Sequence, residues 1–428
     1  MSDYRFADLF AGCGGFSLGF LLAGMKGRFA VERDQMAFET FYENLIINPK
    51  NKFDYFDWPI WLEKKAWDID YLLKTHEKKL KSLVHTIDVL IGGPPCQGFS
   101  LAGQRKGNDP RNFLFQHYAE VVKAIQPKII VLENVPSMRA AHKLYKSKGA
   151  NKSFYEKLVN LLENIGYEVQ SEVIDASKFG VPQKRERLIA IGVRSDLVDE
   201  ASSGPLRVFT LIEKNRKRHL KALNLKTTIS VSEAISDLQL YRRQPATFDL
   251  SRQVKYKGPI SHYQKLMHSK LSGSMDSMKV IQHRDYMIDR YSDILSTCSK
   301  GMKIDDKTRK RLGITKRIVI PLAANMPAPT LTTLPDDFIH YCEPRILTVR
   351  EYARLQSFPD WFLFKGKYTT GGISRRYECP RYTQIGNAVP PYLAKVIAQA
   401  ITEYLDEQIE IKDKIFKSYS RRRISALV

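Results

Sequence analysis

Residues 8–20 read DLFAGCGGFSLGF, an apolar run followed by a glycine-rich turn and a second apolar run. The pattern predicts a strand that ends at Leu9, a tight turn, and a helix that begins directly after the turn. Glycines in such a turn let a ligand approach the backbone, and the first N–H groups of the helix remain free to bind an anion. A dinucleotide-binding fingerprint would have glycine where this chain has Ser17, so a simple dehydrogenase is disfavoured.

Apolar runs of strand length recur along the first half of the chain, and segments with a helical period separate them. The predicted strands cover residues 4–9, 28–31, 86–91, 128–132 and 188–193, and the predicted helices include residues 113–125, 154–165 and 391–409. Strands and helices that alternate over about 190 residues predict a doubly wound α/β domain with a parallel sheet. Ligands of such a sheet bind at the carboxyl ends of its strands.

Length and charge predict a second domain that binds a polyanion. The chain has 428 residues, 43% of them apolar, which suffices for one large and one smaller core. Residues 201–320 carry 25 Lys and Arg against 10 Asp and Glu, and so hold +15 of the formal net charge of +22. Clustered basic side chains gain affinity by displacing counterions from phosphates, although charge alone is also compatible with a merely soluble basic protein.

The five cysteines show no pattern of a structural site. Cys13, Cys96, Cys298, Cys342 and Cys379 include no Cys-x-x-Cys pair, and no histidine has the spacing of a zinc ligand. The first residues, MSDYRFADLF, lack the basic start and long apolar stretch of a signal peptide, and no run approaches 18 apolar residues. We therefore expect a protein of the reducing cytoplasm without disulfides, metal centre or membrane partner.

The stretch DVLIGGPPCQGFS at residues 88–100 presents one cysteine on a stiff loop. A predicted strand delivers two glycines to the ligand-binding edge of the sheet, and two prolines then restrict the backbone before Cys96. A lone intracellular cysteine is more often a small apolar filler than a nucleophile. Because a filler needs neither the prolines nor the polar pair that follows, we interpret Cys96 as a nucleophile whose thiolate is favoured by basic surroundings.

Charged side chains also stand at the ends of other predicted strands. Glu32 and Glu133 end two of them; the first can accept hydrogen bonds from ribose hydroxyls, and the second can hold or donate a proton near neutrality. In VPQKRERLIAIGV at residues 181–193, Arg185 and Arg187 alternate and therefore share one face of a strand. Two guanidinium groups on one face suit phosphate or carbonyl oxygens. Taken singly, each of these residues is also compatible with an exposed strand end.

In this order, the stretches closely resemble the cytosine-C5 DNA methyltransferase family of prokaryotic restriction-modification type. DLFAGCGGFSLGF resembles its first motif, GGPPCQGFS its nucleophile motif, ENV its proton-handling motif, QKRER its arginine motif, and RILTVREYARLQSFPD and QIGNAVPP its ninth and tenth motifs. The resemblance covers residues 4–193 and 327–405. It implies a Rossmann-like α/β sheet for S-adenosylmethionine-dependent methyl transfer in residues 1–198, completed by 381–428, and a smaller target-recognition domain with a hinge in 199–380.

The resemblance implies four catalytic residues. Cys96 adds to C6 of a cytosine that has flipped out of the duplex, while Glu133 hydrogen-bonds its N3 and exocyclic amine. Arg187 is the candidate for gripping the cytosine O2, and Arg185 is expected on a neighbouring phosphate or on Glu133. C5 then takes the methyl group from S-adenosylmethionine.

The family motifs also imply a set of cofactor-binding positions. They are Asp8, Phe10, Gly12, Gly14, Gly15, Glu32, Asp68, Ile69, Pro95, Leu114 and Asn387. Asp68 and Ile69 take the place of an Asp-Ile pair that contacts adenine, although Asp70 competes with Asp68 for that role. Arg33 stands where some relatives have an aromatic residue, which leaves the adenine-stacking partner open, and residues 44–85 look longer than the family minimum.

The implied partner is double-stranded DNA, bound by a cytoplasmic prokaryotic monomer, and a cognate restriction endonuclease would act separately. The nearest alternative is a tRNA cytosine-C5 methyltransferase on the same scaffold. That branch has a Cys-Phe-Thr element, absent here, and a proline after the PPCQ string, where this chain has Gly98. A catalytically silent DNA-binding paralogue would be expected to lack a catalytic residue, and an oxidoreductase gives Cys96 no task.

Overall fold

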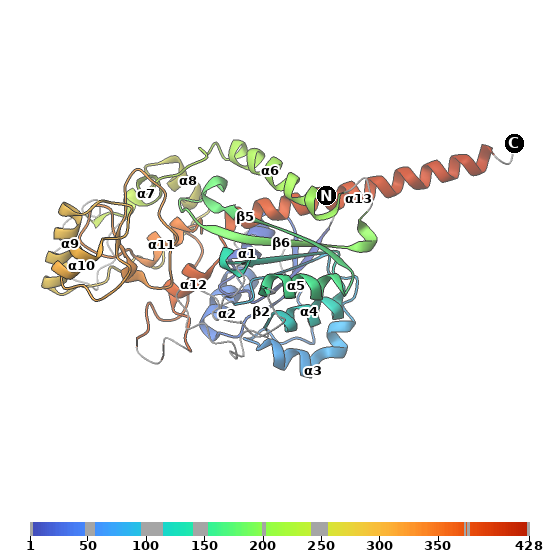
Figure 1. Ribbon diagram of the computed structural model, residues 1–428, viewed down its shortest axis with the longest axis horizontal. Helices are drawn as coiled ribbons and strands as arrows, with labels where there is room; N and C mark the ends of the chain where they lie inside the picture. The colour runs from blue at the N-terminus through green and yellow to red at the C-terminus, as the bar shows by residue number, and fades with distance from the viewer. Residues whose placement is uncertain are drawn as a thin grey trace.

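The computed structural model describes residues 3–47, 56–95, 114–139, 153–198, 203–240, 256–371, 374 and 377–425. Figure 1 shows a large α/β unit and, on its left, a smaller unit of short helices and irregular chain. The strands of the α/β unit are β1 (Arg5–Leu9), β2 (Lys26–Val31), β3 (Val89–Gly92), β4 (Ile129–Asn134), β5 (Tyr167–Asp175) and β6 (Glu186–Arg194). Its helices are α1 (Gly15–Leu22), α2 (Gln35–Tyr42), α3 (Ile69–Lys81), α4 (Leu114–Ile125), α5 (Phe154–Glu163), α6 (Gly204–Ala222), α12 (Arg381–Asn387) and α13 (Pro391–Ser425).

The six strands form one sheet in the order β2-β1-β3-β4-β6-β5. The first four strands in this order are parallel, as predicted. The expectation of a fully parallel sheet is wrong for β6, which runs antiparallel to both β4 and β5. The reason lies in the connection between β5 and β6, because residues 176–185 are too few for the crossover that a parallel pair requires.

Strand β5 is an element that the sequence analysis did not predict. Its residues YEVQSEVID alternate between buried and exposed over most of their length, because β5 lies at the edge of the sheet. The strands β3 and β4 at the centre are instead buried at every position, which makes them continuous apolar runs that are easy to find in the sequence. The alternation in β5 is the signal that would have revealed it.

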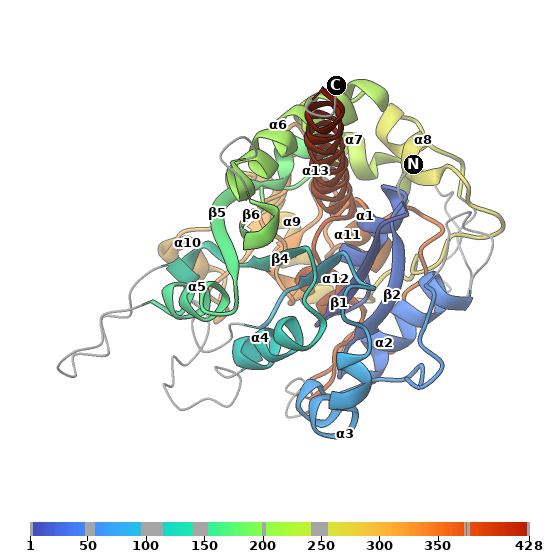
Figure 2. The same cartoon turned by 90° about the vertical axis from the view of Figure 1, so that its right-hand side faces the viewer.

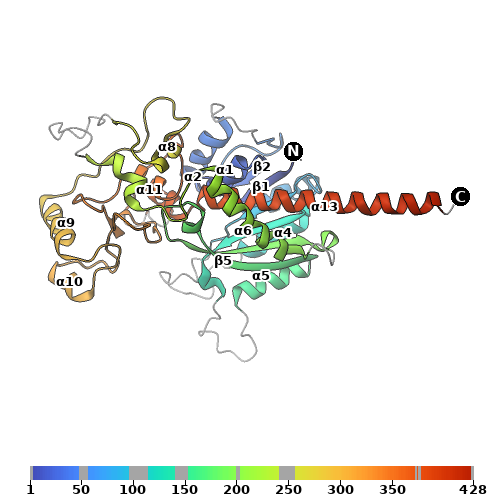
Figure 3. The ribbon, with the colours of Figure 1, turned by 90° about the horizontal axis from the view of Figure 1, so that it is seen from above.

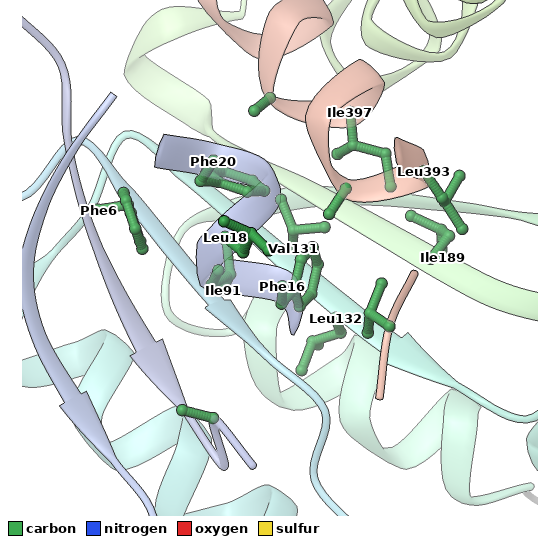
Figure 4. Close-up of a cluster of buried hydrophobic side chains, with 14 of the residues drawn as sticks. Phe6, Phe16, Leu18, Phe20, Ile91, Val131, Leu132, Ile189, Leu393 and Ile397 are labelled. Atoms are coloured by element: carbon green, nitrogen blue, oxygen red, sulfur yellow. The ribbon is translucent and has the colours of Figure 1, made fainter. Parts of the chain in front are cut away.

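Helices cover both faces of the sheet. In Figure 2, where α13 points towards the viewer, α13 and α6 lie above the sheet and α3 and α4 lie below it. Helix α1 is enclosed between the sheet and α13: Figure 4 shows Phe16, Leu18 and Phe20 directed into a cluster with Ile397 and Val131. This layer of apolar side chains fixes the position of the turn that precedes α1.

The second unit comprises the described parts of residues 229–371. Its helices are α7 (Val231–Ile235), α8 (His262–His268), α9 (Asp285–Thr297), α10 (Asp306–Arg311) and α11 (Val349–Leu355), and its strands are β7 (Ile320–Pro321) and β8 (Phe338–Ile339). Helices α7, α8 and α11 share the core of the α/β unit, whereas α9 packs on a separate small core. The members of that core are Tyr291, Ile294, Ile304, Val319, Ile339 and Ile346. The end that carries α9 and α10 is therefore a lobe with its own packing.

Helix α6 lies beyond the predicted domain boundary at residue 199 but packs on α13 and on β5 and β6. Arg207 forms an ion pair with Glu407 at 2.6 Å, and Lys214 forms one with Glu403 at 2.6 Å. The predicted boundary at residue 199 would therefore divide α6 from α13, β5 and β6, on which it packs.

Helix α13 continues to Ser425 and projects beyond the rest of the chain, as Figure 3 shows. The helix therefore extends 16 residues beyond its predicted end at residue 409. In the part of the chain that the structure describes, no helix has both the length and the apolar character needed to cross a membrane.

The contact between α1 and α13 provides a test of the fold. A side-chain carbon added at Gly19 would lie 2.3 Å from Ala394 Cβ and 2.6 Å from the backbone nitrogen of Lys395. We expect Gly19→Ala to lower the free energy of unfolding by about 1–3 kcal/mol, because the strain of overpacking exceeds the gain in helix propensity of about 1 kcal/mol. Urea denaturation measures the change. Gly371→Ala is the matched control, because a carbon there would meet no atom within 4 Å; a stabilised Gly19→Ala variant would contradict the packing.

Candidate active site

The carboxyl ends of the four parallel strands meet at one edge of the sheet. Leu9 pairs with Val31 and with Gly92, and Gly92 pairs with Leu132, so the residues that follow these positions emerge side by side. The glycine turn after β1, Glu32 after β2, the proline turn after β3 and Glu133 at the end of β4 therefore share this edge, as the sequence analysis predicts.

Glu133 and Arg187 form an ion pair at this edge. The Nε atom of Arg187 lies 2.7 Å from Oε1 of Glu133, and both side chains are only 11% exposed. Arg187 reaches the carboxylate because β6 is the hydrogen-bonded neighbour of β4. The pair presents an acceptor and a donor to the same space, which suits a planar heterocycle that carries both kinds of group.

The glycine-proline turn after β3 is held against the same strand. The side-chain amide of Asn134 donates to the carbonyl oxygen of Pro94 at 3.0 Å. A carbon added at Gly93 would lie 3.2 Å from Oε2 of Glu133, so the backbone passes directly beside the carboxylate. Pro95 is the last described residue of this turn, and the predicted nucleophile Cys96 lies outside the described residues.

The glycine turn after β1 is tied to the end of β2. Phe10 has a φ of 62° and Gly14 a φ of 92°, which bends the chain sharply into α1. The Glu32 carboxylate accepts hydrogen bonds from the backbone N–H groups of Gly12 at 2.9 Å and Asp34 at 2.8 Å. Burial raises the pKa of Glu32, and these two hydrogen bonds oppose part of that shift.

Asp8 is the penultimate residue of β1, just before this glycine turn, and is buried. Its Oδ2 accepts a hydrogen bond from the Ser17 hydroxyl at 2.6 Å. Burial raises the pKa of Asp8 to about 8; the charge of Glu32 adds to the shift and the Ser17 hydrogen bond opposes it. Two carboxyl groups at one turn, each with a raised pKa, favour a ligand that carries positive charge.

The Asp-Ile pair predicted to contact adenine lies at the start of α3. The backbone N–H of Trp67 donates to the carbonyl oxygen of Glu32 at 2.8 Å, which joins this segment to the end of β2. Asp68 caps α3 by accepting from the N–H groups of Asp70 and Tyr71, and Ile69 is buried. Asp70, the competing candidate, forms an ion pair with Lys74 at 2.6 Å. The geometry places either carboxylate at the helix start and leaves the choice open.

The turn that contains Asn387 closes over the glycine turn. Cys13 Sγ lies 3.6 Å from the carbonyl oxygen of Gln384, and a carbon added at Gly15 would lie 2.4 Å from the carbonyl oxygen of Val389. Asn387 itself is exposed, as a ligand-binding side chain requires. Leu114, another predicted cofactor residue, is the half-buried first residue of α4. The segment from Gln384 to Val389 therefore packs directly against the first glycine turn.

The structure corrects the predicted contact of Arg185. Its guanidinium group is buried and donates to the carbonyl oxygens of Leu331, Gly386 and Ala388. Among the described residues, it is Arg187 that pairs with Glu133. The alternating pattern of the strand does put both arginines on one face. The side chain of Arg185, however, is enclosed by Leu331 and residues 386–388, where no phosphate can reach it.

Three polar residues that position the site were missed in the sequence. Asn134, Ser17 and Gln356 hold the proline turn, the Asp8 carboxyl group and the 385–388 turn, respectively. Ser17 interrupts the apolar run of α1, and a buried polar side chain in such a place usually has a hydrogen-bond partner. Asn134 and Gln356 each have a polar neighbour in the sequence, Glu133 and Ser357, so no comparable signal marks them.

Comparison with known proteins identifies the family. A family model for C-5 cytosine-specific DNA methylase matches residues 4–403. The chain belongs to this family. The methyltransferase is 33% identical to the type II methyltransferase M.DdeI of Desulfomicrobium norvegicum, over 96% of its own length and 93% of that protein. It is 30% identical to M1.HphI of Haemophilus parahaemolyticus, over 92% and 86% of the two chains.

A solved structure shares the fold. It is a DNA modification methyltransferase encoded within a prophage of E. coli, with a TM-score of 0.62 and 25% identity, over 94% of this chain and all of that one. The protein is therefore a DNA cytosine-C5 methyltransferase of restriction-modification type that uses S-adenosylmethionine, as the sequence predicts.

The edge of the sheet fits this cofactor. A carbon added at Gly12 would meet no atom within 4 Å, so the glycine turn is open on that side. Glu32 and Asp8 would supply carboxyl groups to this cofactor, which carries a sulfonium and an ammonium group, and Glu32 would also accept hydrogen bonds from its ribose hydroxyls.

The raised pKa of Asp8 predicts how stability depends on pH. The folded protein holds a proton on Asp8 up to about pH 8, whereas the unfolded chain releases it near pH 3.8. The free energy of unfolding of the ligand-free methyltransferase should therefore fall as pH rises from 5 to 8, with a slope contribution of up to about 1.4 kcal/mol per pH unit. Asp8→Asn keeps the acceptor for Ser17 and should flatten this dependence. Urea denaturation at each pH measures it, and parallel curves for the two proteins would contradict the assignment.

Proposed function

We propose that this methyltransferase acts on a cytosine flipped out of a specific sequence in double-stranded DNA, with Cys96 as the covalent nucleophile. The observation that carries the proposal is the Arg187–Glu133 ion pair, set beside the glycine-proline turn whose next residue is Cys96. Such a group of residues is needed to activate C5, because that carbon is a poor nucleophile in an unperturbed cytosine.

The proposed steps assign one role to each side chain. The Cys96 thiolate forms a bond to C6, and Glu133 hydrogen-bonds N3 and the exocyclic amine, which stabilises the ring as electrons shift towards C5. Arg187 holds Glu133 in place and donates to the cytosine O2. S-adenosylmethionine, when bound, supplies the electrophilic methyl group that C5 accepts. S-adenosylhomocysteine leaves, a base removes the C5 proton, and the Cys96–C6 bond breaks with its electron pair returning to the thiolate, which restores the ring.

A restrained turn serves the first of these steps. Attack at C6 requires approach from one face of the ring, and good positioning can supply about 7–11 kcal/mol of the barrier. Pro94 and Pro95 limit the conformations of the chain just before Cys96, and the Asn134 hydrogen bond anchors Pro94 to β4. In the proposed mechanism, the restrained residues before Cys96 hold its thiolate in position for attack.

The second unit is proposed to bind the duplex. The target carbon is inaccessible in a stacked helix, so flipping costs a few kcal/mol that contacts to the flanking DNA must offset. The α9–α10 lobe exposes basic side chains, among them Lys307, Lys310 and Arg311. Phosphate contacts from such side chains set affinity, and a few others read base edges.

The cellular setting follows the type II methyltransferases that the chain resembles. We propose a monomer in the cytoplasm of a prokaryote, with a separate cognate restriction endonuclease as its partner in defence.

Covalent trapping tests the mechanism. Duplex DNA that carries 5-fluorocytosine at the target site should form an adduct with the methyltransferase in the presence of S-adenosylmethionine, because fluorine cannot leave as a cation and the Cys96–C6 bond persists. Denaturing gel electrophoresis detects the adduct. Cys96→Ser should form none and should abolish turnover while it retains DNA binding. An adduct with the serine variant, or none with folded wild-type protein on its cognate site, would contradict the mechanism.

Salt dependence tests the role of the second unit. We expect DNA affinity to fall at least 100-fold, roughly, between 50 and 200 mM salt, as counterion release predicts for several phosphate contacts. Replacing Lys307, Lys310 and Arg311 with Gln should reduce the slope of log K against log salt by about 1–2. The matched control replaces three exposed lysines of α3 with Gln, namely Lys78, Lys79 and Lys81. Equal slopes for the two triple variants would overturn the assignment.

A further inference from the structure

We propose that Arg185 is a positioning residue that fixes the cofactor turn at Asn387 and the Leu331 segment of the second unit relative to the cytosine site. The inference rests on the proposed function, because Asn387 is taken as a cofactor contact and the Arg187–Glu133 pair as a cytosine contact. It assigns Arg185 a task different from binding phosphate or substrate.

Arg185 donates hydrogen bonds to the backbone carbonyls of two segments that are distant in the chain, and to the side chain of Gln183. Its Nη2 donates to the carbonyl oxygen of Gly386 at 2.7 Å and to that of Ala388 at 3.2 Å. These two carbonyls flank Asn387 directly. Its Nη1 donates to the carbonyl oxygen of Leu331 at 3.2 Å, and the whole residue is only 1% exposed.

The side chain of Gln183, two residues earlier on the same face, extends this junction. Its Oε1 accepts from the backbone N–H of Leu331 at 2.9 Å, and its Nε2 donates to Oε1 of Gln356 at 3.0 Å. Gln356 in turn donates to the carbonyl oxygen of Ile385 at 2.8 Å. The 385–388 turn is therefore held by Arg185 and by Gln356, and both are fully enclosed.

The packing leaves this turn no alternative position. A carbon added at Gly386 would lie 2.2 Å from the carbonyl oxygen of Thr332, so the turn is in direct contact with the segment that Arg185 holds at Leu331. On its other side the turn meets Gly15 of the glycine turn. A shift of the Arg185 guanidinium group would thus move the cofactor side of the site as well as the Leu331 segment of the second unit.

Only arginine satisfies this geometry. Its planar guanidinium group presents donors in a rigid fork, whereas a lysine ammonium is a compact point donor that cannot span carbonyls of both segments. Burial lowers the pKa of Arg185, the positive charge of Arg187 adds to that effect, and the negative charge of Glu133 opposes it. The charge of Arg185 is therefore stabilised mainly by carbonyl dipoles of the segments that it joins.

The chain offers a matched control for a lysine substitution. Arg350 is also fully buried, and it also donates to three carbonyl oxygens, those of Asp276, Pro359 and Phe362. It lies in α11 and joins segments of the second unit, and none of these three carbonyls belongs to residues 385–388. Arg185→Lys and Arg350→Lys should therefore disturb folding to a comparable extent, and only the first should disturb the cofactor turn.

The experiment compares the two variants by calorimetric titration with S-adenosylhomocysteine and by steady-state kinetics. For Arg185→Lys we expect the dissociation constant to rise about 10-fold, the effect of one misplaced hydrogen bond. The KM for S-adenosylmethionine should rise in parallel, while kcat at saturating cofactor stays within about 3-fold of wild type. Arg350→Lys should leave the dissociation constant within about 2-fold of wild type.

Two results would overturn the inference: equal cofactor affinity in the two lysine variants, or a loss of kcat in Arg185→Lys without loss of cofactor affinity. Thermal melting establishes that each variant is folded. If Arg185→Lys does not fold, Gln356→Met replaces it, because it releases the same turn from the other side and should weaken S-adenosylhomocysteine binding in the same way. Failure of the wild-type protein to trap 5-fluorocytosine would instead count against the proposed function.

Discussion

The ion pair between Arg187 and Glu133 constrains the rest of the site, because two nearly buried charges are stable only while they face each other. Removing one partner of such a pair typically costs about 3–5 kcal/mol, since the remaining charge is left without compensation. The pair spans neighbouring strands, so it depends on the register of β4 against β6. A one-residue slip of one strand would put the two side chains on opposite faces of the sheet.

The cofactor side of the edge is governed by a different balance. Asp8 and Glu32 are acidic groups enclosed by a turn that they also stabilise through Ser17, Gly12 and Asp34. Their raised pKa values mean that their ionised forms are unfavourable in the ligand-free protein. A cationic ligand bound at this turn would favour the ionised forms, so its binding would lower both pKa values.

The sequence predicted those parts of the site that are set by local pattern. The central strands are continuous apolar runs, and the residues that follow them had to meet at one edge. The role of Arg185 could not be predicted in this way. The alternating pattern places Arg185 and Arg187 on one face. Arg185 binds carbonyl groups that lie 146 and 201 residues further along the chain, and this separates its role from that of Arg187. Local pattern carries no information about such partners.

The direction of β6, which the sequence analysis predicted wrongly, is what makes the site possible. Arg185 and Arg187 stand at the beginning of that strand, and in a parallel strand they would lie at the amino-terminal edge of the sheet, across its full width from Glu133. In the antiparallel arrangement Leu188 pairs with Asn134 and Ile189 with Glu133, so the arginines arrive at the carboxyl edge. The hairpin of β5 and β6 therefore explains how the arginines at the beginning of β6 come to lie beside Glu133 at the end of β4. If the arginines of QKRER act together with Glu133, they must reach the same edge of the sheet. A strand that begins with these arginines and follows this rule has to run antiparallel to β4.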